Sequence, residues 1–265
     1  MLLKGKRVIV TGGMTGIGKA TVLACVKEGA KVVSFSRAAP TEERVKKVLE
    51  IANELGAGQG KAIHIRVDVS DKAQVMNGFE KAVEWMGGVD GLVNSAAVAS
   101  VKPAEDLTKE DVLAEIEVNV LGTIYTNQLA FRYMNDKGGS IVNYSSFNGV
   151  MGGPGMPTYS TTKGAVLGWS RSIAKDWGRY GIRVNIVVPG VQTELEEKTE
   201  AMFPEAKQEG YEEMKTIIMN YSIPLGGKLG KPEDAANLNV FLLSDMSSFM
   251  TGQTIGVDGG MMMSR

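Results

Sequence analysis

The sequence has few of the residues that build metal and thiol chemistry. Its 265 residues include one histidine, His64, and one cysteine, Cys25. A single cysteine cannot form a disulfide within the chain, and a single histidine with no ligand cluster argues against a metal site and a histidine-based triad. We therefore predict no metal, a buried structural thiol, and a strand position without catalytic role for His64, which lies in an alternating apolar run.

Charge bias and long hydrophobic runs are missing too. The formal net charge is −1, and 43% of the residues are hydrophobic. This balance gives neither a basic surface for nucleic acid nor an acidic tail. No run of 18 apolar residues occurs, and the amino terminus passes directly into a strand-like run. We expect a cytoplasmic enzyme that binds neither nucleic acid nor a membrane, with one catalytic domain over residues 1–265.

What the sequence does contain is a regular alternation of β-branched runs and amphipathic segments. Strand patterns occupy residues 7–10, 31–35, 61–67, 91–93, 140–144 and 181–188. Helical patterns occupy residues 19–29, 41–55, 72–86, 111–135 and 157–177. Strands that alternate with helices are typical of a Rossmann-like, doubly wound parallel sheet. We predict an α/β fold with about seven strands flanked by helices.

A glycine-rich loop, Thr11-Gly12-Gly13-Met14-Thr15-Gly16-Ile17-Gly18, joins the first strand to the first helix. Glycine lets the backbone approach a pyrophosphate closely, and the start of a helix offers unpaired N–H groups. A glycine-rich turn alone is a weak signal, but its place between a strand and a helix favours nucleotide binding.

A second group of residues combines a serine, a tyrosine and a lysine. Ser146 follows the strand at 140–144, and Tyr159 and Lys163 lie four apart on the helix at 157–177. They therefore share one helix face. An ordinary tyrosine titrates near pH 10, and an ammonium one turn away favours its phenolate, which suits proton transfer to and from an alcohol oxygen. The alternative is an ordinary pair on a solvated helix face.

These motifs together resemble the short-chain dehydrogenase/reductase family over essentially the full chain. The loop matches TGxxxGxG, Tyr159 and Lys163 match YxxxK, and Ser146 lies thirteen residues before Tyr159, as the family serine does. The tyrosine–lysine spacing differs from the six residues of the enoyl-reductase branch. The resemblance implies hydride transfer between nicotinamide and a secondary alcohol or ketone.

The resemblance also assigns catalytic roles. Tyr159 gives or takes the proton, Ser146 positions the substrate oxygen, and Lys163 lowers the pKa of Tyr159 and binds the nicotinamide ribose. Asn119, in the helix at 111–135, holds a water that refills the proton. A non-catalytic nucleotide-sensing regulator on this fold is a remote alternative, because Ser146, Tyr159 and Lys163 are all present.

By the same resemblance, the cofactor contacts are spread along the chain. They are Gly12, Thr15, Gly16, Ile17, Gly18, Ser36, Arg37, Asp68, Val69, Asn94, Ala96, Tyr159, Lys163, Pro189, Gly190 and Thr193. Asp68 is an equally good helix cap. Ala97 replaces the last glycine of the family's NNAG, and Thr193 comes one residue early for its PGxxxT.

The end of the second strand predicts the choice of dinucleotide. Ser36 and Arg37 stand where an acidic side chain would bind the adenosine ribose of NAD. A guanidinium beside a hydroxyl suits a phosphate, so NADP is favoured. NAD remains the alternative, because Met14 and Thr15 provide no second basic residue in the glycine loop.

The substrate side is rich in methionine and aromatic residues. Residues 191–222 are expected to form a helical lobe over the substrate, and Met151 and Met156 flank the catalytic serine and tyrosine. We predict substrate contacts from Ser146, Tyr159, Met151 and Met156. A pliable apolar pocket suits a bulky alicyclic substrate, with a hydroxysteroid first and a 3-oxoacyl thioester or sugar alcohol next. Alternatively, the lobe packs only on its own domain. The family also implies a homotetramer or homodimer.

Overall fold

Seven parallel strands form one sheet in the order β3-β2-β1-β4-β5-β6-β7. The structure is a computed structural model that describes residues 1–203 and 211–262. The strands are β1 (Arg7–Thr11), β2 (Lys31–Ser36), β3 (Lys61–Arg66), β4 (Gly91–Asn94), β5 (Gly139–Tyr144), β6 (Ile182–Pro189) and β7 (Thr254–Val257). The order reverses between β1 and β4, so the predicted doubly wound parallel sheet is confirmed.

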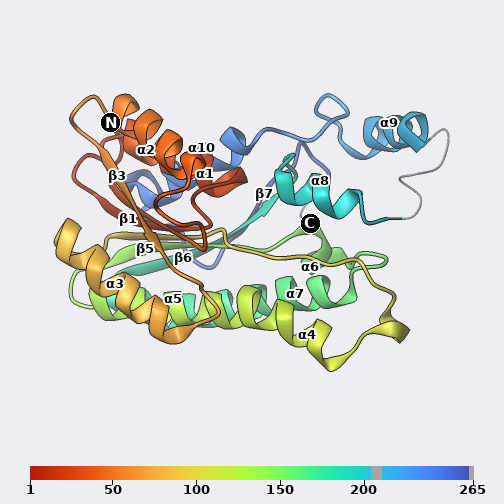
Figure 1. The fold of residues 1–265 in the computed structure, drawn as a ribbon, viewed down its shortest axis with the longest axis horizontal. Helices are drawn as coiled ribbons and strands as arrows, with labels where there is room; N and C mark the ends of the chain where they lie inside the picture. The colour runs from red at the N-terminus through yellow and green to blue at the C-terminus, as the bar shows by residue number, and fades with distance from the viewer. Residues whose placement is uncertain (204–210, 263–265) are drawn as a thin grey trace.

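Helices cover both faces of the sheet in two layers (Figure 1). One layer holds α1 (Gly16–Lys27), α2 (Glu43–Leu55) and α10 (Pro232–Leu243), and the other holds α3 (Lys72–Met86), α5 (Gly122–Met134) and α7 (Pro157–Trp177). The remaining helices are α4 (Lys109–Glu115), α6 (Phe147–Met151), α8 (Glu194–Glu200), α9 (Tyr211–Ser222), η1 (Ala104–Asp106), η3 (Gly178–Tyr180) and η5 (Asp245–Ser247).

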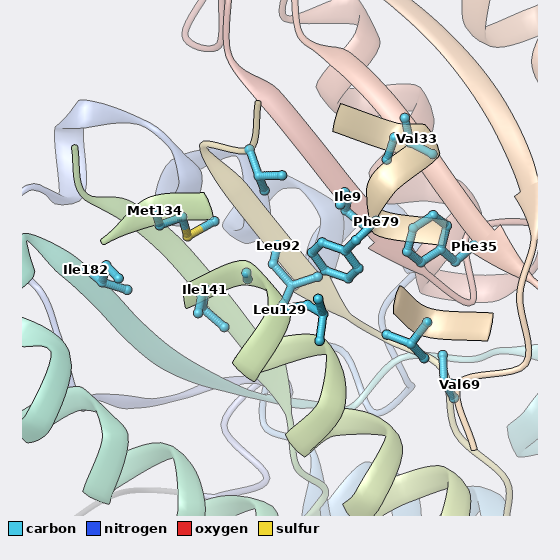
Figure 2. Close-up of a cluster of buried hydrophobic side chains, with 14 of the residues drawn as sticks. Ile9, Val33, Phe35, Val69, Phe79, Leu92, Leu129, Met134, Ile141 and Ile182 are labelled. Carbon is cyan, nitrogen blue, oxygen red and sulfur yellow. The ribbon is translucent and has the colours of Figure 1, made fainter. Parts of the chain in front are cut away.

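The alternation of apolar residues along each strand produces these two layers. In β1, Val8 and Val10 pack into the core under α1 and α10, whereas Ile9 packs into the core under α3 and α5. Figure 2 shows this second core, where Phe79 of α3 lies beside Leu92 of β4 and Leu129 of α5. Both faces are buried, which holds the strand ends in fixed positions.

The helix predicted over residues 111–135 is present, and its middle is a π-helical turn. α4, the π-helical turn η2 (Ile116–Leu121) and α5 follow one another directly, from Lys109 to Met134. Two buried polar side chains, Glu115 and Asn119, lie at this junction. A π-turn widens the helix at such positions, and π-turns occur frequently at functional sites.

Helices α8 and α9 belong to the predicted lobe over 191–222 and lie at the right of Figure 1, outside the two helix layers. Residues 204–210 of that lobe lie outside the described residues. None of the helices in residues 1–203 and 211–262 combines the length and the apolar character that crossing a bilayer requires.

Candidate active site

The carboxyl ends of the parallel strands meet at one edge of the sheet, and two adjoining cavities open there. The first has a volume of about 220 Å³ and the second about 490 Å³. The two share five lining residues: Ile17, Ser95, Ala97, Thr193 and Leu195. A ligand site at the point where strand order reverses is the expected place in such a sheet.

The first cavity collects most of the predicted cofactor residues. These are Gly12, Thr15, Gly16, Ile17, Gly18, Ser36, Arg37, Asp68, Val69, Ala96 and Thr193. They come from the loop after β1 and the start of α1, the end of β2, and the residues after β3, β4 and β6. Four further predicted residues, Tyr159, Lys163, Pro189 and Gly190, line the second cavity instead.

The glycine loop leaves no room for side chains. A Cβ on Gly18 would lie 2.3 Å from the Gly12 carbonyl oxygen, and a Cβ on Gly12 would lie 2.9 Å from the Ala96 nitrogen. Gly12 and Gly16 also have positive φ angles of +67° and +47°. The first turn of α1 begins at Gly16, so its free N–H groups border the cavity. A dinucleotide with a pyrophosphate therefore fits this backbone-lined wall.

Asn94 is not among the residues that line either cavity, and its contact with the cofactor stays a prediction. Its Nδ2 donates to Asn143 Oδ1 at 2.9 Å, and its Oδ1 accepts from Thr126 Oγ1 at 2.8 Å. A buried amide must find partners inside the protein. Asn94 finds them between β5 and α5, so its side chain ties the sheet to the helix layer.

The second cavity contains the predicted catalytic group. Tyr159 and Lys163 lie on α7, and Lys163 Nζ is 5.6 Å from the centre of the Tyr159 ring. Lys163 Nζ also donates to the Tyr144 carbonyl oxygen at 3.1 Å. Ser146 follows β5, and its hydroxyl hydrogen-bonds to the Tyr159 side chain. The sequence prediction that these three side chains meet at one place is confirmed by this placement.

Burial dominates the electrostatics of this group. It raises the pKa of Tyr159 to about 12, against the lowering effect of the bond with Ser146. It also lowers the pKa of Lys163 to about 8. The lowering of the Tyr159 pKa by Lys163 stays a prediction. In this structure both charged forms lose hydration, and that loss is the largest influence on each pKa.

Asn119 is buried, and its side chain is fully engaged. Its amide exchanges two hydrogen bonds with the Val98 backbone, at 2.9 and 2.8 Å, and donates to Thr162 Oγ1 at 3.1 Å. Asn119 thereby fixes the loop after β4, in which Ala97 and Ala99 line the second cavity. Its role in a proton path stays a prediction.

The two predicted methionines differ in placement. Met156 is 6% exposed and lines the second cavity. Met151 is 66% exposed and is not a lining residue, and its role as a substrate contact stays a prediction.

Three charged residues of the second cavity were not singled out from the sequence. Glu196 and Glu200 of α8 and Lys215 of α9 line it, and Lys215 forms an ion pair with Glu200. Enclosure raises the pKa of Glu196, and Glu200 raises it further. The sequence signal was the helical spacing of 196 and 200, which places both on one face.

The residues predicted to have no site role lie elsewhere. His64 is a buried residue of β3 whose ring nitrogens lie 3.3 Å from Ser34 Oγ and 3.0 Å from the Ala38 carbonyl oxygen. Cys25 is fully buried in α1, and burial raises the pKa of its thiol to about 12. Within the part of the chain that the structure describes, no three His, Cys, Asp or Glu side chains are grouped to hold a metal.

Comparison with known proteins gives relatives over nearly the whole chain. The family described as enoyl-(acyl carrier protein) reductase matches residues 12–262. The 3-oxoacyl-[acyl-carrier-protein] reductase of Thermotoga maritima is 37% identical over 98% of this chain and 99% of its own. The L-rhamnose 1-dehydrogenase (NAD(P)(+)) of Azotobacter vinelandii is 36% identical over 98% of both chains.

A third relative and a solved structure extend the range of substrates. The 2,5-dichloro-2,5-cyclohexadiene-1,4-diol dehydrogenase of Sphingobium indicum is 36% identical over 97% of both chains. The crystal structure of levodione reductase superposes with a TM-score of 0.88 at 28% identity, over 97% of this chain and 98% of its own. The similarity thus extends over nearly the whole length of each of these proteins.

Proposed function

We propose that the substrate of this protein is a bulky alicyclic alcohol or ketone, such as a hydroxysteroid. The chain belongs to the short-chain dehydrogenase/reductase family and is an NAD(P)-dependent oxidoreductase of alcohol or ketone groups. The observation that carries this proposal is the second cavity. It has a volume of about 490 Å³, and Ser146 and Tyr159 line it. Many of its other lining residues are apolar.

The residues of the chain divide the chemistry among them. Ser146 and Tyr159 hydrogen-bond the substrate oxygen, and Tyr159 donates the proton when a ketone is reduced. The raised pKa of Tyr159 keeps the phenol protonated at neutral pH, which is the form that reduction needs. Lys163 places a positive charge 5.6 Å from the centre of the Tyr159 ring and would bind the ribose of the dinucleotide. When bound, the dinucleotide supplies or accepts the hydride at its nicotinamide.

The wall of the second cavity supports an apolar substrate. Met156 and Pro154 approach from the segment after α6, and Phe203, Met214 and Ile218 approach from the lobe. Met261, near the end of the chain, also lines it. Methionine side chains adapt to irregular shapes, and ligand cavities of this size bury most of a drug-sized molecule. A fused ring system has a size suited to this cavity and an irregular apolar surface to which methionine side chains adapt.

The carboxylates of the cavity favour a neutral ring over an anionic one. Glu196 lies near enough to Tyr159 to raise the pKa of that phenol, so a negative group beside the reacting carbon would be repelled. The named substrate of the Sphingobium indicum relative, a cyclohexadiene diol, is such a ring. The Thermotoga maritima reductase supports the second candidate, a 3-oxoacyl thioester.

We infer NADP as the preferred dinucleotide from the adenosine end of the first cavity. Ser36 and Arg37 line it, and Arg66 stands opposite Ser36 in the register of β2 and β3. Arg66 does not line the cavity but would add a second basic residue at this sheet edge. A guanidinium beside a hydroxyl would bind a ribose phosphate bidentately. Arg37→Ala should weaken NADPH binding about tenfold or more and leave NADH nearly unchanged, measured by tryptophan fluorescence.

A substrate panel tests the proposed function. Purified protein is mixed with NADPH or NADH and with steroid ketones, small cyclic ketones, acetoacetyl thioesters and a ketose, and loss of reduced cofactor is followed by absorbance. We expect the highest kcat/KM with NADPH and a steroid or other ring ketone. A clear preference for the thioester would replace the proposal with the second candidate. No turnover with any carbonyl would point to the regulator.

A further inference from the structure

Two buried polar atoms near the catalytic group have no hydrogen-bond partner among the described residues. They are Oε2 of Glu115 and Oγ1 of Thr158. Glu115 is only 3% exposed and Thr158 only 6%. A buried carboxylate oxygen without a partner is costly, and most buried polar groups avoid that cost by bonding. This carboxylate therefore calls for a reason beyond packing.

The packing of α7 against the α4–α5 segment places these two atoms on facing turns. Asn119 bonds to Thr162, and Asn127 and Ser170 both bond to Asn143. Asn119 and Thr162 are 43 residues apart in sequence, and so are Asn127 and Ser170, so the two helical segments run side by side with a constant offset. Glu115 and Thr158 are also 43 residues apart, and they lie one helical turn before Asn119 and Thr162. Glu115 thus faces the start of α7, next to Tyr159.

The carboxylate of Glu115 is held by one oxygen only. Its Oε1 accepts from the Ser100 backbone nitrogen at 2.9 Å and from the Ser100 hydroxyl. Its charge acts on both catalytic groups of α7. Glu115 raises the pKa of Lys163, and it raises the pKa of Tyr159. The ammonium of Lys163 in turn lowers the pKa of Glu115, although burial keeps it raised overall.

We propose that Glu115 is the internal counter-ion of Lys163, a positioning residue whose buried negative charge keeps that ammonium protonated behind Tyr159 during turnover. The inference rests on the proposed function for its catalytic consequence. Lys163 is almost fully buried, and its Nζ donates to a neutral carbonyl, that of Tyr144. A buried ammonium without an opposite charge loses its proton easily. Among the described residues, Glu115 supplies the opposite charge that raises the pKa of Lys163.

The other charges around the site define the background of this effect. Glu196 of α8 acts on Tyr159 from the opposite side, and Glu196 is itself influenced by Glu200 and Lys215. These groups line the second cavity, whereas Glu115 lies behind α7 and is not a lining residue. A change at Glu115 therefore alters the charge behind Tyr159 and Lys163 without altering the substrate wall.

The sign of the effect follows from the charges. A nearby carboxylate stabilises an ammonium and destabilises a phenolate, so Lys163 and Tyr159 both keep their protons to higher pH. Glu115→Gln removes the charge but keeps an oxygen that accepts from Ser100. Both groups should then lose their protons at a lower pH, by about one pH unit. Below the pKa of Glu115 the two proteins should converge, because the carboxyl is then neutral in both.

The experiment compares pH profiles of kcat for ketone reduction in the parent protein, Glu115→Gln and Glu117→Gln. Glu117 is the matched control, because it lies two residues away on the same helical segment and is exposed. We expect the alkaline loss of activity to move to lower pH in Glu115→Gln and not in Glu117→Gln. Glu115→Asp, which keeps the charge, should retain the parent profile with a lower kcat.

A purely structural role for Glu115 predicts a different set of results. In that case Glu115→Gln would give a profile superimposable on that of the parent, while Glu115→Ala would lose activity at every pH through the freed Ser100 loop. That outcome would overturn the proposal. A shift of equal size in Glu117→Gln would overturn it as well, because the effect would not be specific to the buried charge.

A measurement without substrate separates this inference from the proposed function. Ionisation of Tyr159 is followed in ultraviolet difference spectra, with the Tyr159→Phe protein subtracted to remove the other six tyrosines. The phenolate should form at lower pH in Glu115→Gln than in the parent protein. If no carbonyl substrate is turned over, the proposed function fails, yet this titration still decides whether Glu115 acts on the catalytic group. Equal titration curves would reject the counter-ion role.

Discussion

The hydroxyl of Tyr159 is subject to three opposing influences. Burial and the carboxylates of Glu115 and Glu196 raise its pKa, whereas the bond with Ser146 lowers it. Burial is the largest of these, so the phenol stays protonated far above neutral pH. At rest the site is therefore set to give a proton. Alcohol oxidation, which needs the phenolate, should become faster as pH rises.

Removing this hydroxyl tests its role directly. Tyr159→Phe keeps the ring against Lys163 but has no proton to give, so we expect kcat for ketone reduction to fall by about 10²- to 10⁴-fold. Dinucleotide affinity should change little, because the first cavity keeps its lining. Steady-state kinetics measure kcat, and a fluorescence titration measures the dinucleotide affinity.

The control is Tyr133→Phe, whose ring stacks on Phe79 with centroids 6.2 Å apart, away from the site. A Tyr159→Phe protein with near-parent kcat would exclude Tyr159 as the proton donor.

At the scale of elements, the site depends on the close fit between the glycine loop and the strand ends. The carbonyl of Gly12 lies directly against the Cα of Gly18, and the Ala96 nitrogen donates to Thr11 Oγ1 at 3.1 Å. Ser95 Oγ donates to the Thr11 carbonyl oxygen at 2.7 Å. The loop after β1 and the segment after β4 therefore hold each other in place, and the first cavity lies between them.

A methyl group at Gly18 should disrupt this fit. In Gly18→Ala the new Cβ would meet the Gly12 carbonyl oxygen at 2.3 Å, so the loop must move. We expect a loss of stability of about 1–3 kcal/mol and a clear weakening of dinucleotide binding.

Gly168→Ala is the control, since its Cβ would meet nothing within 4 Å on helix α7. It should stabilise the protein by about 0.5–1 kcal/mol. Chemical unfolding and cofactor titration give both values, and equal behaviour of the two variants would contradict the role of the loop.

At the scale of the whole molecule, apolar side chains remain at the surface near the end of the chain. Phe249 is 103% exposed and Met246 66% exposed, in the segment between α10 and β7. An exposed apolar patch of this kind marks an interaction surface. We propose a homo-oligomer of two or four chains, in which this segment and β7 lie at a subunit contact.

A charge at this patch should weaken the assembly. In Phe249→Glu a carboxylate replaces the exposed ring, and its burial at a contact would be costly. We expect a shift to smaller species, measured by light scattering coupled to size exclusion, with the fold unchanged by circular dichroism. Lys47→Glu, an exposed change on α2, should leave the mass unchanged. A parent protein that is monomeric throughout the concentration range would contradict the proposal.

The sequence by itself determined the order of strands and helices, the dinucleotide loop and the serine–tyrosine–lysine group, because each depends on local spacing: β-branched runs, glycines between strand and helix, and a four-residue step on one helix face. Only the tertiary structure decided the direction of the pKa of Tyr159, the exposure of Met151, the hydrogen bonds of the Asn94 side chain and the burial of Glu115. These properties depend on burial and on charges contributed by elements far apart in sequence. The spacing of residues within one segment cannot predict which residues of other segments bury a given atom.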